Sequence, residues 1–136
     1  MEMKAGVEKT IDSWILGWKN GDHLEIASLY MDPCVFYSTL GDNLVTTREG
    51  VGLYFKEAFD LAPGVTVTVD PKHWMQLKND IVSLSGSFRF HLPNKGDAPA
   101  RFTWIFREIN DLWNIQLHHS SVIATSLLGV DMNTSS

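Results

Sequence analysis

The segment from Ala100 to Ser121 constrains the fold more than any other part of the chain. It reads ARFTWIFREINDLWNIQLHHSS, and apolar residues recur at every second position on both sides of Asn110-Asp111. This period predicts β-strands, and the Asn-Asp step favours a tight turn between antiparallel strands. The segment therefore predicts a long β-hairpin. Because an isolated hairpin is marginal in water, the rest of the chain must cover its apolar face.

Two helices are predicted before the first strand. The first has an apolar face at spacings of three and four residues, formed by Val7, Ile11, Trp14, Ile15 and Trp18. Asn20-Gly21 ends it, because glycine readily adopts the left-handed conformation found after helices. Asp22 and Glu25 form a capping box that predicts a second, short helix extending to Tyr30. Asp32-Pro33 ends that helix, because the residue before proline is pushed out of helical dihedral angles.

A short strand and a third helix come next. The residues from Cys34 to Leu40 are mostly apolar or aromatic and predict a strand. Leu44 to Thr46 are expected to return as its partner. Thr46 and Glu49 match a second capping box, and Pro63-Gly64 ends the helix that follows. The buried face of this helix is predicted to hold Val51, Phe55, Ala58, Phe59 and Ala62.

The second half of the chain has the period of β-strands. Val65 to Leu77 and Ile81 to Leu92 alternate apolar and polar residues, with Asn79-Asp80 between them. Pro71 cannot donate to a ladder hydrogen bond, so we expect a sheet edge or a bulge there. Helices followed by a long antiparallel sheet predict an α+β fold. We expect one domain over residues 1–123 and a polar tail over residues 124–136.

Composition argues against several classes of function. The 136 residues carry a formal net charge of −5, which argues against a nucleic-acid partner because no basic stripe could displace counterions. No apolar run is long enough to span a membrane, so no membrane partner is expected. The single Cys34 cannot form an internal disulfide, which suggests a reducing cytoplasm. We interpret this cysteine as a small buried residue.

The sequence predicts neither a metal site nor a cofactor. The five histidines fall on separate elements or on opposite strand faces. None has the helical i, i+4 spacing that is typical of zinc ligands. There is also no glycine-rich loop that could hold a phosphate group.

The hairpin resembles the end of a nuclear transport factor 2-like domain. The pattern that carries this resemblance is Arg101-Phe102-Thr103, a turn, and then Trp113-x-Ile115-x-x-x-His119-x-Ser121. Further landmarks that fit the same superfamily are Asn20-Gly21-Asp22, Asp32-Pro33, Gly50 with Tyr54-Phe55, and Val65 to Leu77 followed by Asn79-Asp80. Over Ala5 to Val122, the chain is most similar to the association domain of calcium/calmodulin-dependent protein kinase II and to small stand-alone SnoaL-like proteins.

The resemblance implies a strongly bent, cone-shaped sheet around a pocket, with the long first helix as its lid. It also implies that the outer sheet face often pairs in a homodimer. In the isomerases and cyclases of this superfamily, the carboxylate base falls at about Ser38, the donor tyrosine at about Trp14 and the protonated acid near Thr103. None of these residues is an ionisable acid, which argues against ketosteroid-type isomerisation.

Polar residues of the last strands are further candidates for the pocket. His118 and His119 are adjacent in a strand and therefore point to opposite faces. The resemblance favours His119 as a pocket or pocket-wall residue, whereas the sequence leaves open which of the two histidines faces the pocket. It also implies that arginines of two strands line the pocket, which suggests Arg101 and either Arg89 or, one residue earlier, Phe88. A buried arginine would select a carboxylate, whereas the alternative is a salt bridge on an exposed sheet face.

Together these patterns predict a pocket with a few polar groups under aromatic walls. The candidate residues are Trp14, Phe36, Ser38, Arg89, Arg101, Thr103, His118 and His119. Our first hypothesis is a small-molecule-binding or assembly module whose ligand is a small carboxylate or a polar-substituted ring. The alternative is an isomerase or lyase of the ketosteroid isomerase or SnoaL polyketide cyclase kind, with a histidine in place of the usual carboxylate. We also expect a homodimer through the outer sheet face.

Overall fold

The computed structural model describes residues 2–123. The helices are α1 (Glu2–Asn20), α2 (His23–Ser28) and α3 (Arg48–Leu61). The strands are β1 (Tyr30–Tyr37), β2 (Thr66–Lys78), β3 (Ile81–Leu92), β4 (Gly96–Ile109) and β5 (Leu112–Val122). Among the described residues, no helix is both long and apolar enough to cross a membrane. The predicted tail over residues 124–136 lies outside this part of the chain.

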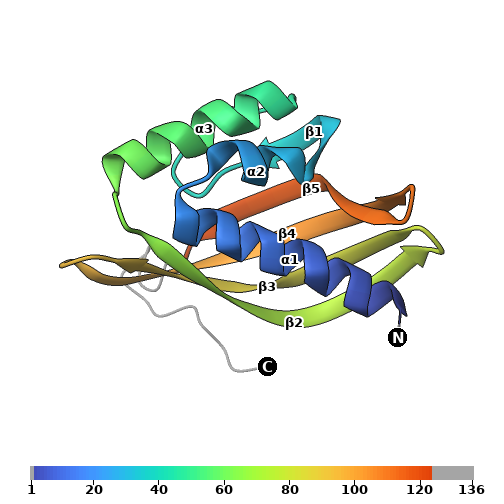
Figure 1. The fold of residues 1–136 in the computed structure, drawn as a ribbon. Coiled ribbons are helices and arrows are strands. Elements are labelled where there is room, and N and C mark those ends of the chain that lie inside the picture. Colours follow the sequence, from blue (N-terminus) through green and yellow to red (C-terminus); the bar gives the residue numbers. More distant parts are fainter. Residues whose placement is uncertain (1, 124–136) are drawn as a thin grey trace.

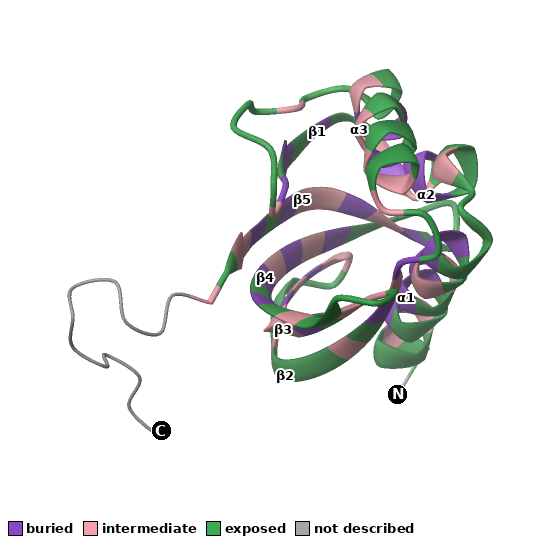
Figure 2. Cartoon of the chain, turned by 90° about the vertical axis from the view of Figure 1, so that its left-hand side faces the viewer, coloured by how far each residue is buried: buried purple, intermediate pink, exposed green. Residues whose placement is uncertain are grey.

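The five strands form one bent sheet in the order β1-β5-β4-β3-β2. Helix α1 lies across one face of this sheet, while α2 and α3 lie on the same side nearer to β1 (Figure 1). The curvature of the sheet is plain in the second view (Figure 2). The predicted α+β fold, with a bent sheet under one long and two shorter helices, is confirmed.

Helix α2 begins as predicted but ends earlier. The Asp22 carboxylate accepts a hydrogen bond from the Glu25 amide at 3.1 Å, and Gly21 has a φ of 61° before this cap. The helix stops at Ser28, and Tyr30, predicted as its end, is instead the first residue of β1. Tyr30 is paired with Ile115 of β5, so the sheet contact overrides the local helical pattern.

Helix α3 begins one residue later than predicted. Its N-cap is Thr47, whose hydroxyl accepts a hydrogen bond from the Gly50 amide at 3.0 Å. Thr46, predicted as the cap, is held beside β1, because its carbonyl accepts a hydrogen bond from the Cys34 amide at 3.0 Å.

Strand β1 differs from the short hairpin that the sequence predicts. Leu44 to Thr46 form no strand within the described residues, although Val45 makes a single bridge to Phe36. The strand pairs in parallel with β5, whereas the other neighbouring strands are antiparallel. The sheet, predicted to be antiparallel, therefore has one parallel pair at its edge.

Two irregularities interrupt the strand ladders. In β2, at the edge of the sheet, the register shifts beside Pro71, as predicted for a proline. In β5, Gln116 is an extra residue between Ile115 and Leu117, which pair with consecutive residues of β4. Such a bulge shifts by one residue which side chains face the core.

The predicted hairpin from Ala100 to Ser121 is confirmed, and its apolar side faces the core. Asn110 and Asp111 have φ values of 52° and 64°, the left-handed conformation of a two-residue hairpin turn. The inward residues of β4 are Ala100, Phe102, Trp104 and Phe106, all buried. Buried positions alternate along β4 on the side of the sheet that faces the helices, so the concave face is the hydrophobic core (Figure 2).

Candidate functional site

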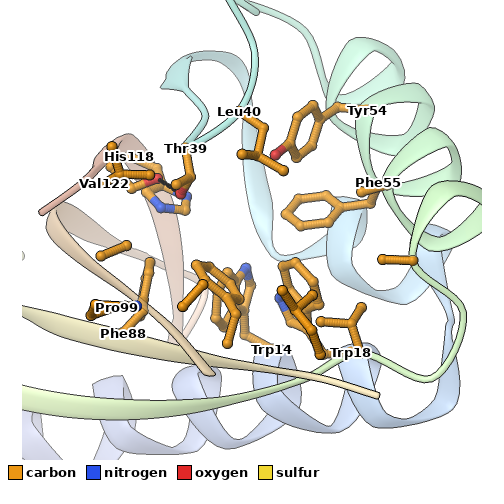
Figure 3. Close-up of a pocket in the computed structure, with 18 of the residues that line it drawn as sticks. Trp14, Trp18, Thr39, Leu40, Tyr54, Phe55, Phe88, Pro99, His118 and Val122 are labelled. Atoms are coloured by element: carbon orange, nitrogen blue, oxygen red, sulfur yellow. Dashed lines mark hydrogen bonds between the residues drawn. The ribbon is translucent and has the colours of Figure 1, made fainter. Parts of the chain in front are cut away.

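A cavity of about 130 Å³ lies between the helices and the concave face of the sheet. Its walls come from α1, β1 and the loop after it, α3 and the loop after it, and strands β3 to β5 (Figure 3). They consist of Trp14, Trp18, Phe36, Thr39, Leu40, Tyr54, Phe55, Ala58, Ala62, Val65, Phe88, Phe90, Leu92, Ala98, Pro99, Ala100, His118, Ser120 and Val122. An engineered apolar cavity of about 150 Å³ in another protein accepts benzene, so this space suits a ring-sized group.

The cavity opens where the loop after β1 meets the ends of β4 and β5. Leu40 and Val122 line the cavity and are nevertheless 79% and 53% exposed, which marks them as its rim. Pro99 at the start of β4 is also an exposed lining residue. Inside the rim, the hydroxyls of Thr39 and Ser120 share a hydrogen bond at 2.7 Å. A ligand would therefore enter past apolar side chains and one polar pair.

Helix α1 places two indole rings on the cavity wall. Trp14 and Trp18 are one helical turn apart, and their ring centroids are 5.6 Å apart. The Trp14 ring is stacked on Phe88 of β3 at 5.1 Å and meets Trp104 of β4 edge-on at the same distance. These aromatic contacts hold the helix on the sheet and fix the rings that face the cavity.

A chain of hydrogen bonds crosses the core behind this wall. The Trp14 indole Nε1 donates to the Tyr30 hydroxyl at 3.2 Å. The same hydroxyl lies 2.7 Å from Nδ1 of His118. All three side chains are buried, and they come from α1, β1 and β5. His118 also contacts Phe36 and Trp104, with ring centroids at 4.8 and 5.3 Å.

Burial keeps both ionisable side chains of this hydrogen-bond chain, His118 and Tyr30, neutral. Desolvation of the imidazole, with a smaller effect of neighbouring His119, lowers the pKa of His118 from 6.5 to about 3. Desolvation likewise raises the pKa of the Tyr30 phenol well above 10, against an opposing effect of the Trp14 hydrogen bond. At neutral pH the site therefore contains a neutral imidazole and a neutral phenol.

Two residues that line the cavity, His118 and Trp18, each have a buried ring nitrogen without a hydrogen-bond partner among residues 2–123. These atoms are His118 Nε2 and Trp18 Nε1. A buried polar atom without a partner costs stability, so a ligand that reached either nitrogen could satisfy it.

The chain's family follows from a match over most of its length. The model of the SnoaL-like domain family matches residues 7–125. The chain belongs to this family. This SnoaL-like domain thus fits the superfamily that its last hairpin resembles.

Several solved structures share this fold. A protein from Xanthomonas campestris, named for the calcium/calmodulin dependent protein kinase II association domain, is 25% identical with a TM-score of 0.77, covering 86% of this chain and 85% of its own. A cystatin-like domain of unknown function from Nostoc punctiforme is 13% identical with a TM-score of 0.79, covering 90% and 78%. A ketosteroid isomerase-like protein from Erwinia carotovora atroseptica is 14% identical with a TM-score of 0.71, covering 88% and 95%. No curated protein matches the chain.

In this SnoaL-like domain, both arginines that were predicted to line the pocket lie outside the cavity. Arg101 is exposed on the outer sheet face, where its Nε donates to the Ser121 hydroxyl at 3.0 Å. Arg89 is also exposed and lies 3.9 Å from the Asp97 carboxylate. Phe88, the alternative to Arg89, is the residue that lines the cavity. The arginine placement is wrong because the concave face is the packed core, and desolvating a guanidinium there would be costly.

Thr103 and His119 also lie on the outer face. The Thr103 hydroxyl is 3.0 Å from that of Ser85 on the neighbouring strand. His119 is exposed beside Tyr37, with ring centroids at 5.3 Å. The expectation that His119 faces the pocket is therefore wrong, because the bulge at Gln116 turns His118 inward instead.

Three of the predicted residues do line the cavity. Trp14, Phe36 and His118 come together there, and their role in ligand binding stays a prediction. Ser38 is buried but is not part of the wall, and its hydroxyl accepts a hydrogen bond from the Gly41 amide at 2.8 Å. Within residues 2–123, no group of three or more His, Cys, Asp or Glu side chains could hold a metal ion.

Sequence reasoning missed two residues that shape the site. Tyr30 was assigned to a helix end, although a tyrosine two residues before Asp32-Pro33 could equally begin the following strand. Trp18 was predicted only to lie on the apolar face of the first helix, and its unpaired nitrogen has no signal in the sequence.

Proposed function

We propose that this SnoaL-like domain binds one small, largely apolar molecule in the cavity beneath Trp14. The observation that carries the proposal is an aromatic cavity of about 130 Å³ that opens to solvent at Leu40 and Val122. Protein interiors normally contain few voids larger than a water molecule. The walls of this cavity are mostly apolar side chains. A ligand that fills it would remove this apolar surface from water, which is favourable.

Filling the cavity with a side chain tests this proposal. Ala58 of α3 lines the cavity, so Ala58→Leu places three further carbon atoms in it. Ala5→Leu makes the same substitution at an exposed position of α1 and serves as the control. Methylenecyclohexane, an apolar ring-sized probe, should quench or shift the fluorescence of the wild type and of Ala5→Leu. Equal binding by Ala58→Leu, or no binding by the wild type, would refute the cavity as the site.

Binding is better supported than proton abstraction. No aspartate or glutamate is among the described residues that line the cavity. Enolisation needs a base beside the substrate, and the buried His118 has a pKa of about 3, which makes it a weak base. Cyclohexanone incubated with the protein in deuterium oxide should therefore exchange its α-protons no faster than with Ala58→Leu. Faster exchange would favour the isomerase or lyase alternative.

We further propose that the outer sheet face pairs two copies of the chain. The half-buried Ile105 and Leu117 lie opposite each other on β4 and β5. Val35 and Tyr37 at the sheet edge are 36% and 40% exposed. Apolar side chains on a sheet face that carries no helix support a face-to-face contact between copies.

A further inference from the structure

We propose that His118 presents its Nε2–H group to the cavity as a fixed hydrogen-bond donor, and that the site selects a neutral carbonyl compound over a carboxylate. This inference rests on the proposed binding function and assigns the class of ligand. It depends on the direction of the hydrogen bonds from Trp14 through Tyr30 to His118.

The direction of these hydrogen bonds follows from the donor inventory. An indole nitrogen can only donate, so the Trp14 Nε1–H group must donate to the Tyr30 oxygen. The phenol proton then has one acceptor within hydrogen-bond distance among the described residues, Nδ1 of His118 at 2.7 Å. In the reverse arrangement, His118 Nδ1–H would donate to Tyr30, leaving both the buried phenol proton and Nε2 without a partner. The forward arrangement leaves one orphan group, and each orphan is costly.

A neutral imidazole carries one proton, so an Nδ1 atom that accepts a hydrogen bond places the proton on Nε2. His118 is 2% exposed, and its Nε2 is buried without a partner within residues 2–123. Figure 3 shows the ring at the cavity beside Thr39, across from the aromatic residues of α3. A carbonyl oxygen in the cavity would accept from this donor. The lining residue Trp18 has an unpartnered Nε1–H group as well, which is a second candidate donor.

The charge of the wall decides between carbonyl and carboxylate. No lysine or arginine is among the described residues that line the cavity. Burying a carboxylate without a cation is strongly unfavourable, whereas a ketone needs only the neutral donor. The carboxylate ligand expected from buried arginines is therefore disfavoured, because Arg89 and Arg101 lie on the outer face.

The tautomer can be measured without any ligand. Nitrogen NMR of protein with labelled histidine distinguishes a protonated from a bare imidazole nitrogen. For His118 we expect a protonated Nε2 and a bare Nδ1 at neutral pH. Tyr30→Phe removes the hydroxyl that imposes this arrangement, so Nδ1–H should become populated. A protonated Nδ1 in the wild type would overturn the inference.

The selectivity is tested with three probes of one ring size. Cyclohexanone and methylenecyclohexane have the same ring, but the ketone has an oxygen where the alkene has a CH2 group. Cyclohexanecarboxylate has a ring of the same size and carries a negative charge. We expect the ketone to bind about five- to tenfold tighter than the alkene, as one buried hydrogen bond allows, and the carboxylate to bind weakest. Equal affinity for ketone and alkene, or tighter binding of the carboxylate, would overturn the inference. Binding of the alkene would still leave the proposed function intact, so the two failures are distinguishable.

Two substitutions at His118 test the roles of its two ring nitrogens separately. Asn reaches the position of Nδ1 and keeps a partner for Tyr30, but it presents nothing at the position of Nε2. Gln reaches the position of Nε2 and can donate there. The ketone preference should be lost in His118→Asn and largely kept in His118→Gln, with His119→Gln on the outer face as the matched control. A preference that survives in folded His118→Asn would overturn the assignment of the donor.

Discussion

The buried imidazole of His118 should make the stability of the fold depend on pH. Its pKa is lowered from 6.5 to about 3, chiefly by burial. In the unfolded chain the same group titrates near its ordinary value, so below pH 6.5 the unfolded state binds a proton that the native state does not. Its full contribution to stability is therefore present above pH 6.5 and is lost progressively as the pH falls from 6.5 towards 3.

The size of this effect follows from the pKa difference. Each pH unit in the window costs about 1.4 kcal/mol of unfolding free energy for one proton. Between pH 6.5 and 4.5 the protein should thus lose about 2–3 kcal/mol through His118 alone, a large part of a typical domain's stability. Tyr30, the phenol that faces the imidazole, stays protonated throughout this range because its pKa is raised.

Urea denaturation at several pH values measures this contribution. His118→Gln removes the titrating group, and His119→Gln removes its exposed neighbour as a matched control. The difference between wild type and His118→Gln should shrink by about 1.4 kcal/mol per pH unit below pH 6.5, whereas the control should keep the wild-type slope. Identical pH profiles for wild type and His118→Gln would refute the claim that this imidazole is buried in its neutral form.

Two further predictions concern the sheet. Gly86→Ala should destabilise the fold by about 1–3 kcal/mol, because its Cβ would overlap the backbone carbonyl of Asp70 beside the bulge in β2, whereas Ser87→Ala should have little effect in the same denaturation assay. Light scattering at micromolar concentration should give the mass of a dimer for the wild type and of a monomer for Leu117→Arg on the outer face; a monomeric wild type would contradict the proposed pairing.

The sequence was sufficient to predict the fold class because its strongest signals are local, although the parallel pairing of β1 with β5 was not predicted. The apolar period of α1, the Asp22 cap and the Asn110-Asp111 turn each specify one element, and the structure contains all three. The boundary at Tyr30 was missed because helix and strand patterns overlap there, and pairing with β5 decides between them. Propensity alone cannot decide such a position.

The site was harder to predict because it depends on which face of each strand is inward. Arg101 and Thr103 were placed inside on the resemblance, although Phe102 and Trp104 form the apolar set that a packed concave face requires. For His118 the difficulty lies in the bulge. Strict alternation from Ile115 points His119 inward, and nothing in the local sequence marks Gln116 as an extra residue.

This bulge leads to a prediction about chain length. Ile115 and Leu117 pair with consecutive residues of β4, so Gln116 is one residue more than a regular ladder needs. Its side-chain oxygen is buried without a partner in the described part of the chain. Deleting Gln116 should therefore leave a regular strand in which Ile115 and His118 still face the core.

We expect the deletion variant to fold, with the far-ultraviolet circular dichroism of the wild type. The local twist of the bulge would be lost, so the orientation of the His118 ring toward the Tyr30 hydroxyl should change. The nitrogen NMR chemical shifts of the imidazole should change with it. Inserting a second residue after Gln116 would instead turn His118 outward, and that variant should lose several kcal/mol because Ser120 would leave the core face with it. If the deletion unfolds the protein while the insertion is tolerated, the bulge does not determine which side chains of β5 point to the core. The inward position of His118 must then be explained by another feature of the strand.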